Sequence, residues 1–224
     1  MLHYKVIPKC VLKSICEKSE SLSSTFNIKK GGIDVKKLIE VRWHGRGGQG
    51  AVTASKLLAT SALAEGKYIQ AFPEYGPERM GAPIQSFTRI SKNPIKIHCH
   101  VANPSIVVVL DPTLLGGVDV TEGLIEEGVL IINTEKSPGE IRKKLQLKGR
   151  KVYTVDASKI AQETIGRSLP NTPLIGALIK VTGLLTLNNV LADIEDKFKI
   201  KFSSKVVEGN INAIKRAYQE VKGE

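Results

Sequence analysis

The spacing of apolar residues along the chain predicts a series of short strands. Continuous apolar runs cover residues 105–110, 129–132 and 151–155. Runs of this kind are typical of strands that are covered on both faces, as in a parallel sheet. Residues 40–44, which alternate between polar and apolar, and residues 68–72 add two further strands.

Helices are predicted between and after these strands from apolar residues at helical spacing. They cover residues 51–64, 122–127, 138–145 and 174–185, and a last helix carries an apolar stripe made of Val207, Ile211, Ile214 and Tyr218. Because strands alternate with helices, the sequence predicts an α/β fold: a single doubly wound Rossmann-like domain with a mostly parallel sheet.

Local signals add detail to this fold. Thr172 is a suitable N-cap for the helix over 174–185, and Pro173 suits its first position. Residues 84–90 and 95–100 are expected to pair as a hairpin around Asn93 and Pro94.

The chain divides into two parts by composition. Residues 1–37 are rich in lysine and serine, and Gly31 and Gly32 are expected to form a hinge. We therefore expect residues 1–37 to be a peripheral or weakly ordered extension, and residues 38–224 to be the α/β domain.

Charge and hydropathy limit the classes of partner. The net charge is +11, from 33 basic and 22 acidic residues. This balance fits a lysine-rich solvated surface, an acidic partner or an anionic ligand. The basic residues are scattered and aromatic residues are few, which argues against nucleic acid. No apolar run is long enough to span a membrane and residues 1–20 do not resemble a signal peptide, so we expect a cytoplasmic protein.

The cysteines argue against a metal centre in this chain. Cys10, Cys16 and Cys99 form no C-x-x-C pair. An iron–sulfur cluster normally takes four cysteines, and a structural zinc takes at least one close pair. His98 and His100 would share one face of a strand, but no third ligand lies nearby in the sequence. We therefore expect no cluster and no metal bound by this chain.

The strongest local motif is a glycine-rich loop between the first strand and the first helix. Its residues are Gly45, Arg46, Gly47, Gly48, Gln49 and Gly50. The glycines allow a tight turn, and the N-terminus of the following helix offers N–H donors and partial positive charge to a phosphate. Arg46 adds a charged donor. The alternative interpretation is a structural turn with no ligand.

Other candidate residues lie on the same predicted edge of the sheet. Asn171 and Thr172, at the start of a helix, are candidates for a second anion contact. An NAD site would need an acidic residue at the end of the second strand, and Glu74 is the nearest candidate, although it lies beyond Pro73. Asp111 is interpreted as a turn or N-cap residue.

The loop over residues 73–83 is the second distinctive segment. Three prolines stiffen it, and it follows a strand at the edge where open α/β sheets bind ligands. Tyr75 and Met80 lie beside charged residues, a mixture found at protein interfaces. The loop is therefore either a partner-binding segment or a rigid surface turn.

Four separated motifs together resemble one known family. They are W-H-G-R-G-G-Q-G at residues 43–50, F-P-E-Y-G-P-E-R-M-G-A-P at 72–83, F-T-R at 87–89 and P-N-T-P-L-I-G-A at 170–177. In this order and spacing they resemble the gamma subunits of 2-oxoacid:ferredoxin oxidoreductases. The resemblance extends over residues 40–221, and the E-R-M-G-A-P sequence is similar to the pyruvate branch, which includes branched 2-ketoacid enzymes.

The resemblance implies a reaction in which pyruvate is decarboxylated with coenzyme A to acetyl-CoA and CO2, with electrons passed to ferredoxin. It also implies that thiamine diphosphate, Mg and 4Fe-4S clusters belong to the alpha, beta and delta subunits. In the same family the gamma chain lies near the coenzyme A approach. Coenzyme A at residues 45–50, Asn171 and Thr172 is therefore an expectation.

Two other functions stay open from the sequence. One is a self-sufficient nucleotide-binding oxidoreductase, which would be active as an isolated chain. The other is an anion-binding module without a redox role.

Overall fold

The computed structural model describes residues 28–29, 32–33, 38–74 and 81–224. Two short strands, β1 (Ile28–Lys29) and β2 (Gly32–Ile33), pair antiparallel near the start of this part. The rest of the predicted N-terminal extension lies outside the described residues.

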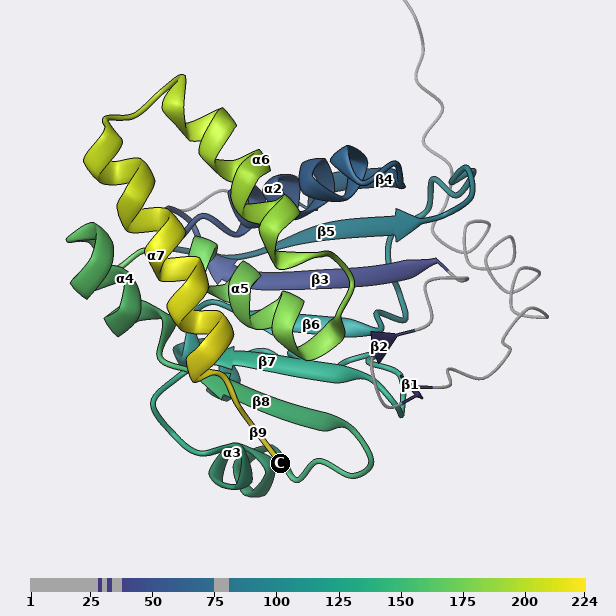
Figure 1. The fold of residues 1–224 in the computed structure, drawn as a ribbon. Helices are drawn as coiled ribbons and strands as arrows, with labels where there is room; N and C mark the ends of the chain where they lie inside the picture. The colour runs from purple at the N-terminus through teal and green to yellow at the C-terminus, as the bar shows by residue number, and fades with distance from the viewer. Residues whose placement is uncertain (1–27, 30–31, 34–37, 75–80) are drawn as a thin grey trace, which may run out of the picture.

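A seven-stranded sheet runs through the described part of the chain, in the order β4-β5-β3-β6-β7-β8-β9 (Figure 1). Its strands are β3 (Ile39–Arg46), β4 (Tyr68–Glu74), β5 (Pro83–Ser91), β6 (Ile106–Val109), β7 (Val129–Asn133), β8 (Lys151–Val155) and β9 (Lys222–Gly223). Strands β3, β6, β7 and β8 pair parallel, whereas β5 runs antiparallel to both β3 and β4, and β9 runs antiparallel to β8. Because β4 therefore points the same way as β3, the predicted mostly parallel sheet is confirmed.

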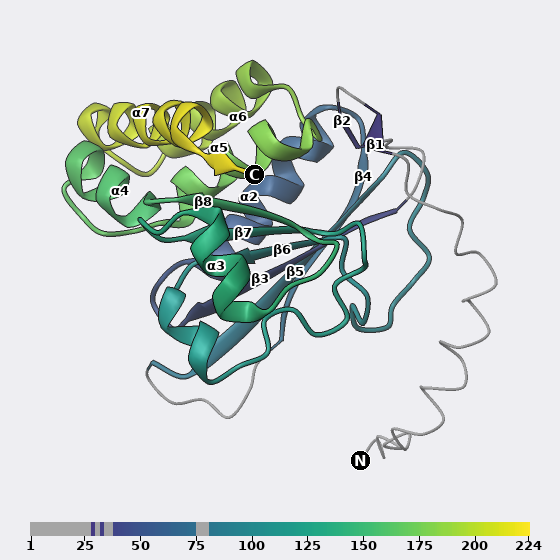
Figure 2. The ribbon, with the colours of Figure 1, turned by 90° about the horizontal axis from the view of Figure 1, so that it is seen from below.

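Helices cover both faces of this sheet, as the doubly wound prediction requires. They are α2 (Ala51–Ala64), α3 (Pro138–Leu145), α4 (Ala157–Ile165), α5 (Asn171–Thr182), α6 (Leu187–Lys199) and α7 (Ser204–Glu220), with a 3₁₀ turn at Pro112–Gly116. Figure 2 shows α3 on one side of the sheet and α4, α5, α6 and α7 on the other. None of the helices in the described ranges is long and apolar enough to cross a membrane.

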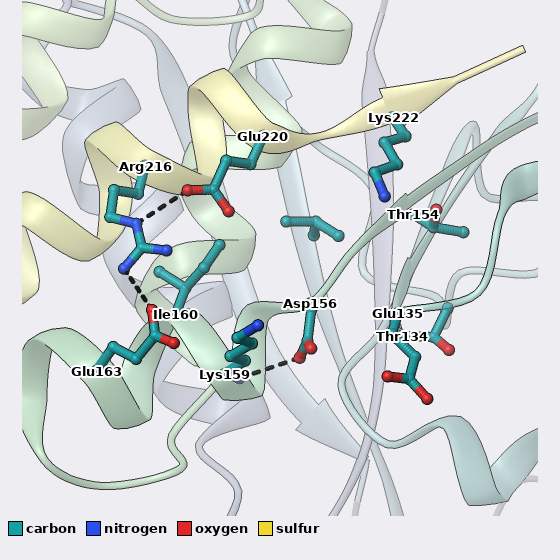
Figure 3. A pocket seen from close by; sticks show the side chains of 11 residues that line it. Thr134, Glu135, Thr154, Asp156, Lys159, Ile160, Glu163, Arg216, Glu220 and Lys222 are labelled. Atoms are coloured by element: carbon teal, nitrogen blue, oxygen red, sulfur yellow. Dashed lines mark hydrogen bonds and ion pairs between the residues drawn. The ribbon is translucent and has the colours of Figure 1, made fainter.

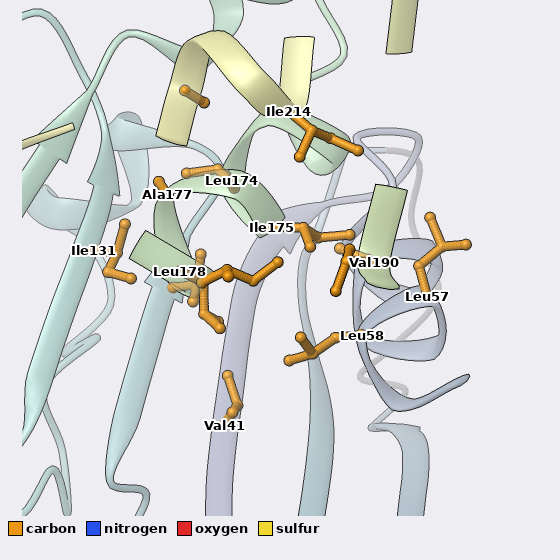
Figure 4. Close-up of a cluster of buried hydrophobic side chains, with 14 of the residues drawn as sticks. Val41, Leu57, Leu58, Ile131, Leu174, Ile175, Ala177, Leu178, Val190 and Ile214 are labelled. Carbon is orange, nitrogen blue, oxygen red and sulfur yellow. The ribbon is translucent and has the colours of Figure 1, made fainter. Parts of the chain in front are cut away.

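Each face of the sheet has its own hydrophobic core, and β6 contributes to both. Ile106 and Val108 belong to the larger core, together with α2, α5, α6 and α7, part of which Figure 4 shows. Val107 and Val109 belong to the smaller core, on the side of α3. All four side chains are fully buried. This burial on both faces explains why the β6 sequence is a continuous apolar run.

The predicted hairpin of residues 84–90 with 95–100 is wrong. Strand β5 has β4 along one edge and β3 along the other, so neither edge is left for a further strand. The 95–100 segment is held by side chains instead. The Arg89 guanidinium donates to the carbonyl oxygens of Ile97 and His100, at 3.4 Å each.

The predicted helix over residues 122–127 is also wrong, because these residues form turns. Gly123 has a φ of +66°, which interrupts a right-handed helix. Arginine side chains take the carbonyl groups that a helix would use. Arg42 donates to the Glu122 oxygen and Arg150 to the Leu124 oxygen.

The start of α5 differs by two residues from the prediction. The helix begins at Asn171 with Pro170 in the N-cap position, so Thr172 is not the N-cap. The Thr172 hydroxyl is instead 2.8 Å from Asn210 Oδ1 on α7, in a buried hydrogen bond. A side chain committed to a neighbouring helix is not free to cap its own.

Candidate functional site

The glycine-rich loop lies at the point where the strand order reverses. From β3 the chain passes through α2 to β4 and β5 on one side, and later crosses to β6 on the other side of β3. Open α/β sheets bind ligands at such a point, outside the carboxyl ends of the strands. Gly45 and Arg46 end β3, two residues beyond the predicted strand, residues 47–50 follow it and Asp111 follows β6, so the loop and Asp111 flank this position.

The loop takes its shape from two glycines and one glutamine. Gly48 and Gly50 have φ values of +90° and +82°, a region that side chains disfavour. Gln49 Oε1 accepts a hydrogen bond from the Arg46 backbone N–H at 2.7 Å, and Gln49 Nε2 donates to Asp111 Oδ2 at 2.7 Å. Through these two hydrogen bonds Gln49 connects the glycine loop to the end of β6, and its side chain does not extend toward solvent.

The Arg46 side chain is held by contacts with three other residues of the chain. Its Nε lies 3.2 Å from Asp111 Oδ2, its Nη1 donates to the Gly81 carbonyl at 2.9 Å, and its Nη2 donates to the Thr113 hydroxyl at 3.1 Å. The side chain is nevertheless 36% exposed. A ligand phosphate would therefore share the guanidinium with Asp111.

Asp111 is the anchor of this cluster and the cap of the 3₁₀ turn that follows it. Its Oδ1 accepts from the Thr113 N–H at 2.9 Å, which confirms the predicted turn-forming role. Burial acts to raise the pKa of the carboxyl. Hydrogen bonds from Thr113 and Gln49 and the charge of Arg46 outweigh burial, and the pKa lies below its usual value. The group is therefore a carboxylate that holds Arg46 in place.

The structure brings Asn171 against the glycine loop. A methyl group added to Gly50 would lie 2.6 Å from Asn171 Nδ2, so the start of α5 touches the start of α2. No side chain caps the first turn of α2. In the first turn of α5, Asn171 Oδ1 accepts a hydrogen bond from the Thr172 N–H at 2.9 Å and Pro173 has no N–H, so the free N–H groups at this place belong mainly to α2. Thr172 is only 1% exposed, and its hydroxyl is already engaged by Asn210.

Two buried polar groups on β3 lie on the same strand as the loop and were not anticipated from the sequence. Arg42 Nε and His44 Nε2 are both inaccessible and have no hydrogen-bond partner among the residues that the structure describes. Burial, followed by the nearby charge of Arg42, lowers the pKa of His44 to about 3, and Asp119 opposes this shift weakly. His44 is therefore a neutral imidazole. The alternation of residues 40–44 would have placed Arg42 and His44 on a solvated face, so it gave no signal of their burial.

The loop between β4 and β5 approaches the glycine loop at its far end. The Gly47 N–H donates to the Ala82 carbonyl at 3.3 Å. This contact confirms that the end of the predicted 73–83 loop lies beside residues 45–50. Residues 75–80, with Tyr75 and Met80, lie outside the described part, as do the side-chain arrangements predicted for them.

A separate pocket of about 470 Å³ lies at the carboxyl ends of β7 and β8 (Figure 3). Its charged side chains mostly serve the fold. Asp156 caps α4 by accepting from the Lys159 N–H, and Arg216 joins Glu163 on α4 to Glu220 on α7. No three histidine, cysteine or acidic side chains in the described ranges gather as metal ligands would.

Comparison with known proteins identifies the family. The profile of the pyruvate ferredoxin/flavodoxin oxidoreductase family matches residues 40–220. The chain belongs to this family. Within the family it is 50% identical to the pyruvate/ketoisovalerate oxidoreductases common subunit gamma of Pyrococcus furiosus, over 83% of this chain and 98% of the relative. It is 49% identical to the pyruvate synthase subunit PorC of Thermotoga maritima, over 84% and 96% of the two chains.

Solved structures of the oxidoreductase family have the same fold. The crystal structure of the pyruvate oxidoreductase subunit PORC from Thermotoga maritima matches with a TM-score of 0.75 and 46% identity, covering 84% of this chain and 99% of that one. A keto/oxoacid ferredoxin oxidoreductase gamma subunit from Geobacter sulfurreducens, at 22% identity, covers 81% and 96% with a TM-score of 0.63. The homologues are thus gamma-type subunits of oxidoreductases that act on 2-oxoacids, as the four sequence motifs implied.

Proposed function

We propose that this chain is the gamma subunit of a cytoplasmic pyruvate:ferredoxin oxidoreductase complex and that it forms part of the coenzyme A site. The complex would convert pyruvate and coenzyme A to acetyl-CoA and CO2 and reduce ferredoxin. Thiamine diphosphate, Mg and 4Fe-4S clusters would be held by the alpha, beta and delta subunits. The isolated chain would then be inactive.

The observation that supports the coenzyme A assignment is the uncapped start of α2 at the glycine loop, with Asn171 of α5 packed against Gly50. Free N–H groups and the partial positive charge of this helix start favour an anion, by about 0.3–1 kcal/mol when exposed. Coenzyme A carries a pyrophosphate and a 3′-phosphate. The exposed part of the Arg46 guanidinium lies on the same loop and adds a charged donor.

The residues of this chain would bind and orient the cosubstrate. A hydrogen bond to a charged group contributes about 1.5–3 kcal/mol. Since Asp111 already shares the Arg46 charge, we use the lower end of that range, and 1.4 kcal/mol corresponds to a factor of ten in affinity. These contributions suit a weakly held cosubstrate.

The test is steady-state kinetics of the assembled complex with Arg46→Ala. We expect the KM for coenzyme A to rise about tenfold, while the steps before coenzyme A, such as radical formation from pyruvate, proceed nearly as in the wild type. Arg46 also donates to Gly81 and Thr113, so Thr113→Val is the matched control: it removes the hydroxyl that accepts from Arg46 Nε and Nη2 and keeps the charge. An unchanged KM in Arg46→Ala would show that the glycine loop is a structural turn.

A branched 2-ketoacid oxidoreductase is the second candidate. The Pyrococcus furiosus relative is named as a subunit common to pyruvate and ketoisovalerate enzymes. Purification of the native complexes through this chain, with mass spectrometry and assays on pyruvate and 2-oxoisovalerate, separates the two. One set of partners and one active substrate would support a dedicated enzyme, and two sets would support a shared subunit.

A further inference from the structure

The turn between α6 and α7 exposes an unusual mixture of side chains. We call residues 197–206, together with Arg167, the α6–α7 corner. Every residue over 199–205 is exposed, and Ile200 and Phe202 are 83% and 49% exposed. These are among the most exposed large apolar side chains of the described residues.

A cavity of about 860 Å³ lies directly beside these two side chains. It is formed by α2, the segment before α5, the end of α6 and the start of α7, and most of its lining is apolar. The apolar residues that line it are Leu57, Ile165, Leu169, Phe198, Ile200, Phe202 and Val206. The cavity is large enough to receive a bulky side chain, and Ile200 and Phe202 extend its apolar surface outward into a contiguous patch. Such a patch marks an interaction site more often than a solitary exposed side chain does.

The charges around the cavity are positive. Lys197 and Lys199 form ion pairs with Asp193 and Glu195 on their own helix, α6. Arg167, Lys201 and Lys205 have no acidic partner in the described part of the chain. The corner therefore carries three uncompensated cations beside an apolar pocket, and its complement is an acidic surface with an apolar anchor.

We propose that the α6–α7 corner docks an acidic segment of another protein subunit of the same complex. One bulky apolar side chain of that segment fills the cavity, and its carboxylates face Arg167, Lys201 and Lys205. This inference rests on the proposed function only in that the chain works within a complex. The cavity also reaches Asn171 and Thr172, so the docked segment would border the proposed coenzyme A site.

A protein partner fits the corner better than other ligands. A small molecule in the cavity would cover at most part of Ile200, which lines the cavity and is 83% exposed. Single-stranded nucleic acid is bound by stacking of its bases on free aromatic faces. Phe198 and Phe202 instead contact each other edge to face, with ring centroids 5.3 Å apart.

The experiment is a competition for assembly. Wild-type and variant full-length chains with different tags are co-expressed with a limiting amount of the other subunits, and the ratio of tags in the purified complex gives relative affinity. We expect Lys201→Glu/Lys205→Glu and Ile200→Glu each to be incorporated at least about tenfold less than the wild type. Ile200→Lys should lose less than Ile200→Glu, because only glutamate repels an acidic partner.

The matched control is Lys144→Glu/Lys148→Glu, on and after α3 at the opposite face of the sheet. It makes the same change in net charge and should be incorporated like the wild type. Circular dichroism and thermal unfolding of each variant show that the fold is kept.

The proposal would be overturned if the corner variants were incorporated as well as the wild type, or if the control lost as much incorporation as the corner variants. Binding of RNA or DNA by the wild-type chain that the corner variants abolish, with assembly unchanged, would assign the surface to nucleic acid. Assembly is scored without activity, so a complex that assembles but does not oxidise pyruvate would refute the proposed function and leave this result intact.

Discussion

A fall in pH from 7 to 5 should destabilise the folded chain through His44. Its side chain is 2% exposed on β3, and burial is the first cause that lowers its pKa from 6.5 to about 3, with the Arg42 charge second. The unfolded chain therefore takes up a proton on this histidine near pH 6.5, and the folded chain does not until the pH approaches 3. Stability contributed by the neutral imidazole is complete above pH 6.5 and is lost as the pH falls toward 3.

The size of the effect follows from the same two pKa values. The full shift of about 3.5 units corresponds to about 5 kcal/mol, since one unit is 1.36 kcal/mol. Only part of this is lost between pH 7 and pH 5, about 2 kcal/mol. Carboxyl groups such as Asp111 and Asp119, whose pKa values the fold lowers, act in the same direction but chiefly below about pH 4. The interval from pH 7 to 5 therefore isolates the histidine.

The assay is urea unfolding of the full chain at pH 7, 6 and 5, with the free energy of unfolding extrapolated to water. His44→Gln removes the titrating group, and its stability should vary little over this interval. His98→Gln, at an exposed position, is the control and should keep the wild-type slope. A wild-type stability that is equal at pH 7 and 5, or a slope that survives in His44→Gln, would refute the reasoning.

Three further predictions concern packing and composition. Gly176→Ala should lower the free energy of unfolding by about 3 kcal/mol, because its methyl group would lie 2.2 Å from the Ile214 carbonyl oxygen on α7. In contrast, Gly139→Ala in α3 meets nothing within 4 Å and should raise stability by about 0.4–1 kcal/mol, as denaturant unfolding would show. The purified chain should contain no stoichiometric iron by elemental analysis, since its cysteines form no cluster motif; bound iron with a visible absorption band would contradict this.

The central strands were predictable because burial on both faces leaves a continuous apolar run. β6, β7 and β8 lie within one or two residues of the predicted ranges. The partner of β5 was not predictable in the same way. Its neighbour β3 is some forty residues earlier in the chain, Trp43 facing Ser86 for example, and local turn signals at residues 93–94 suggested a nearer partner.

Helices α4 and α6 were not predicted, although weak signals existed. The buried face of α4 consists of Ala157, Ile160 and Ala161, so Ile160 is the one large apolar side chain that marks it. In α6 the buried residues Val190, Leu191 and Ile194 have helical spacing. These three residues stand between two asparagines and a cluster of acidic residues and lysines. A segment of that composition is typical of a surface loop.

The same distinction between local and long-range signals applies to the candidate site. The strand–loop–helix context of residues 45–50 is local, and the sequence was sufficient to predict it. The ties from Arg46 and Gln49 to Asp111 depend on β3 and β6 being neighbours, which is a long-range pairing. The approach of Asn171 to Gly50 likewise depends on α5 packing beside α2. The residue types at the candidate site were therefore predictable from the sequence. Which of their side chains bond to one another was not.

The α6–α7 corner was not apparent from the distribution of basic residues over the whole chain. Basic residues are scattered in the sequence as a whole, yet residues 197–202 alternate lysine with Phe198, Ile200 and Phe202. In a strand this alternation would place all three apolar side chains on one face. At the end of a helix, residues four apart share a side, so Phe198 and Phe202 meet at 5.3 Å, while Ile200 is turned about 200° from Phe198 and is 83% exposed. The helix end thus turns an apolar pattern that a strand could bury into an exposed side chain among lysines, which is the arrangement that the proposed docking of an acidic segment uses.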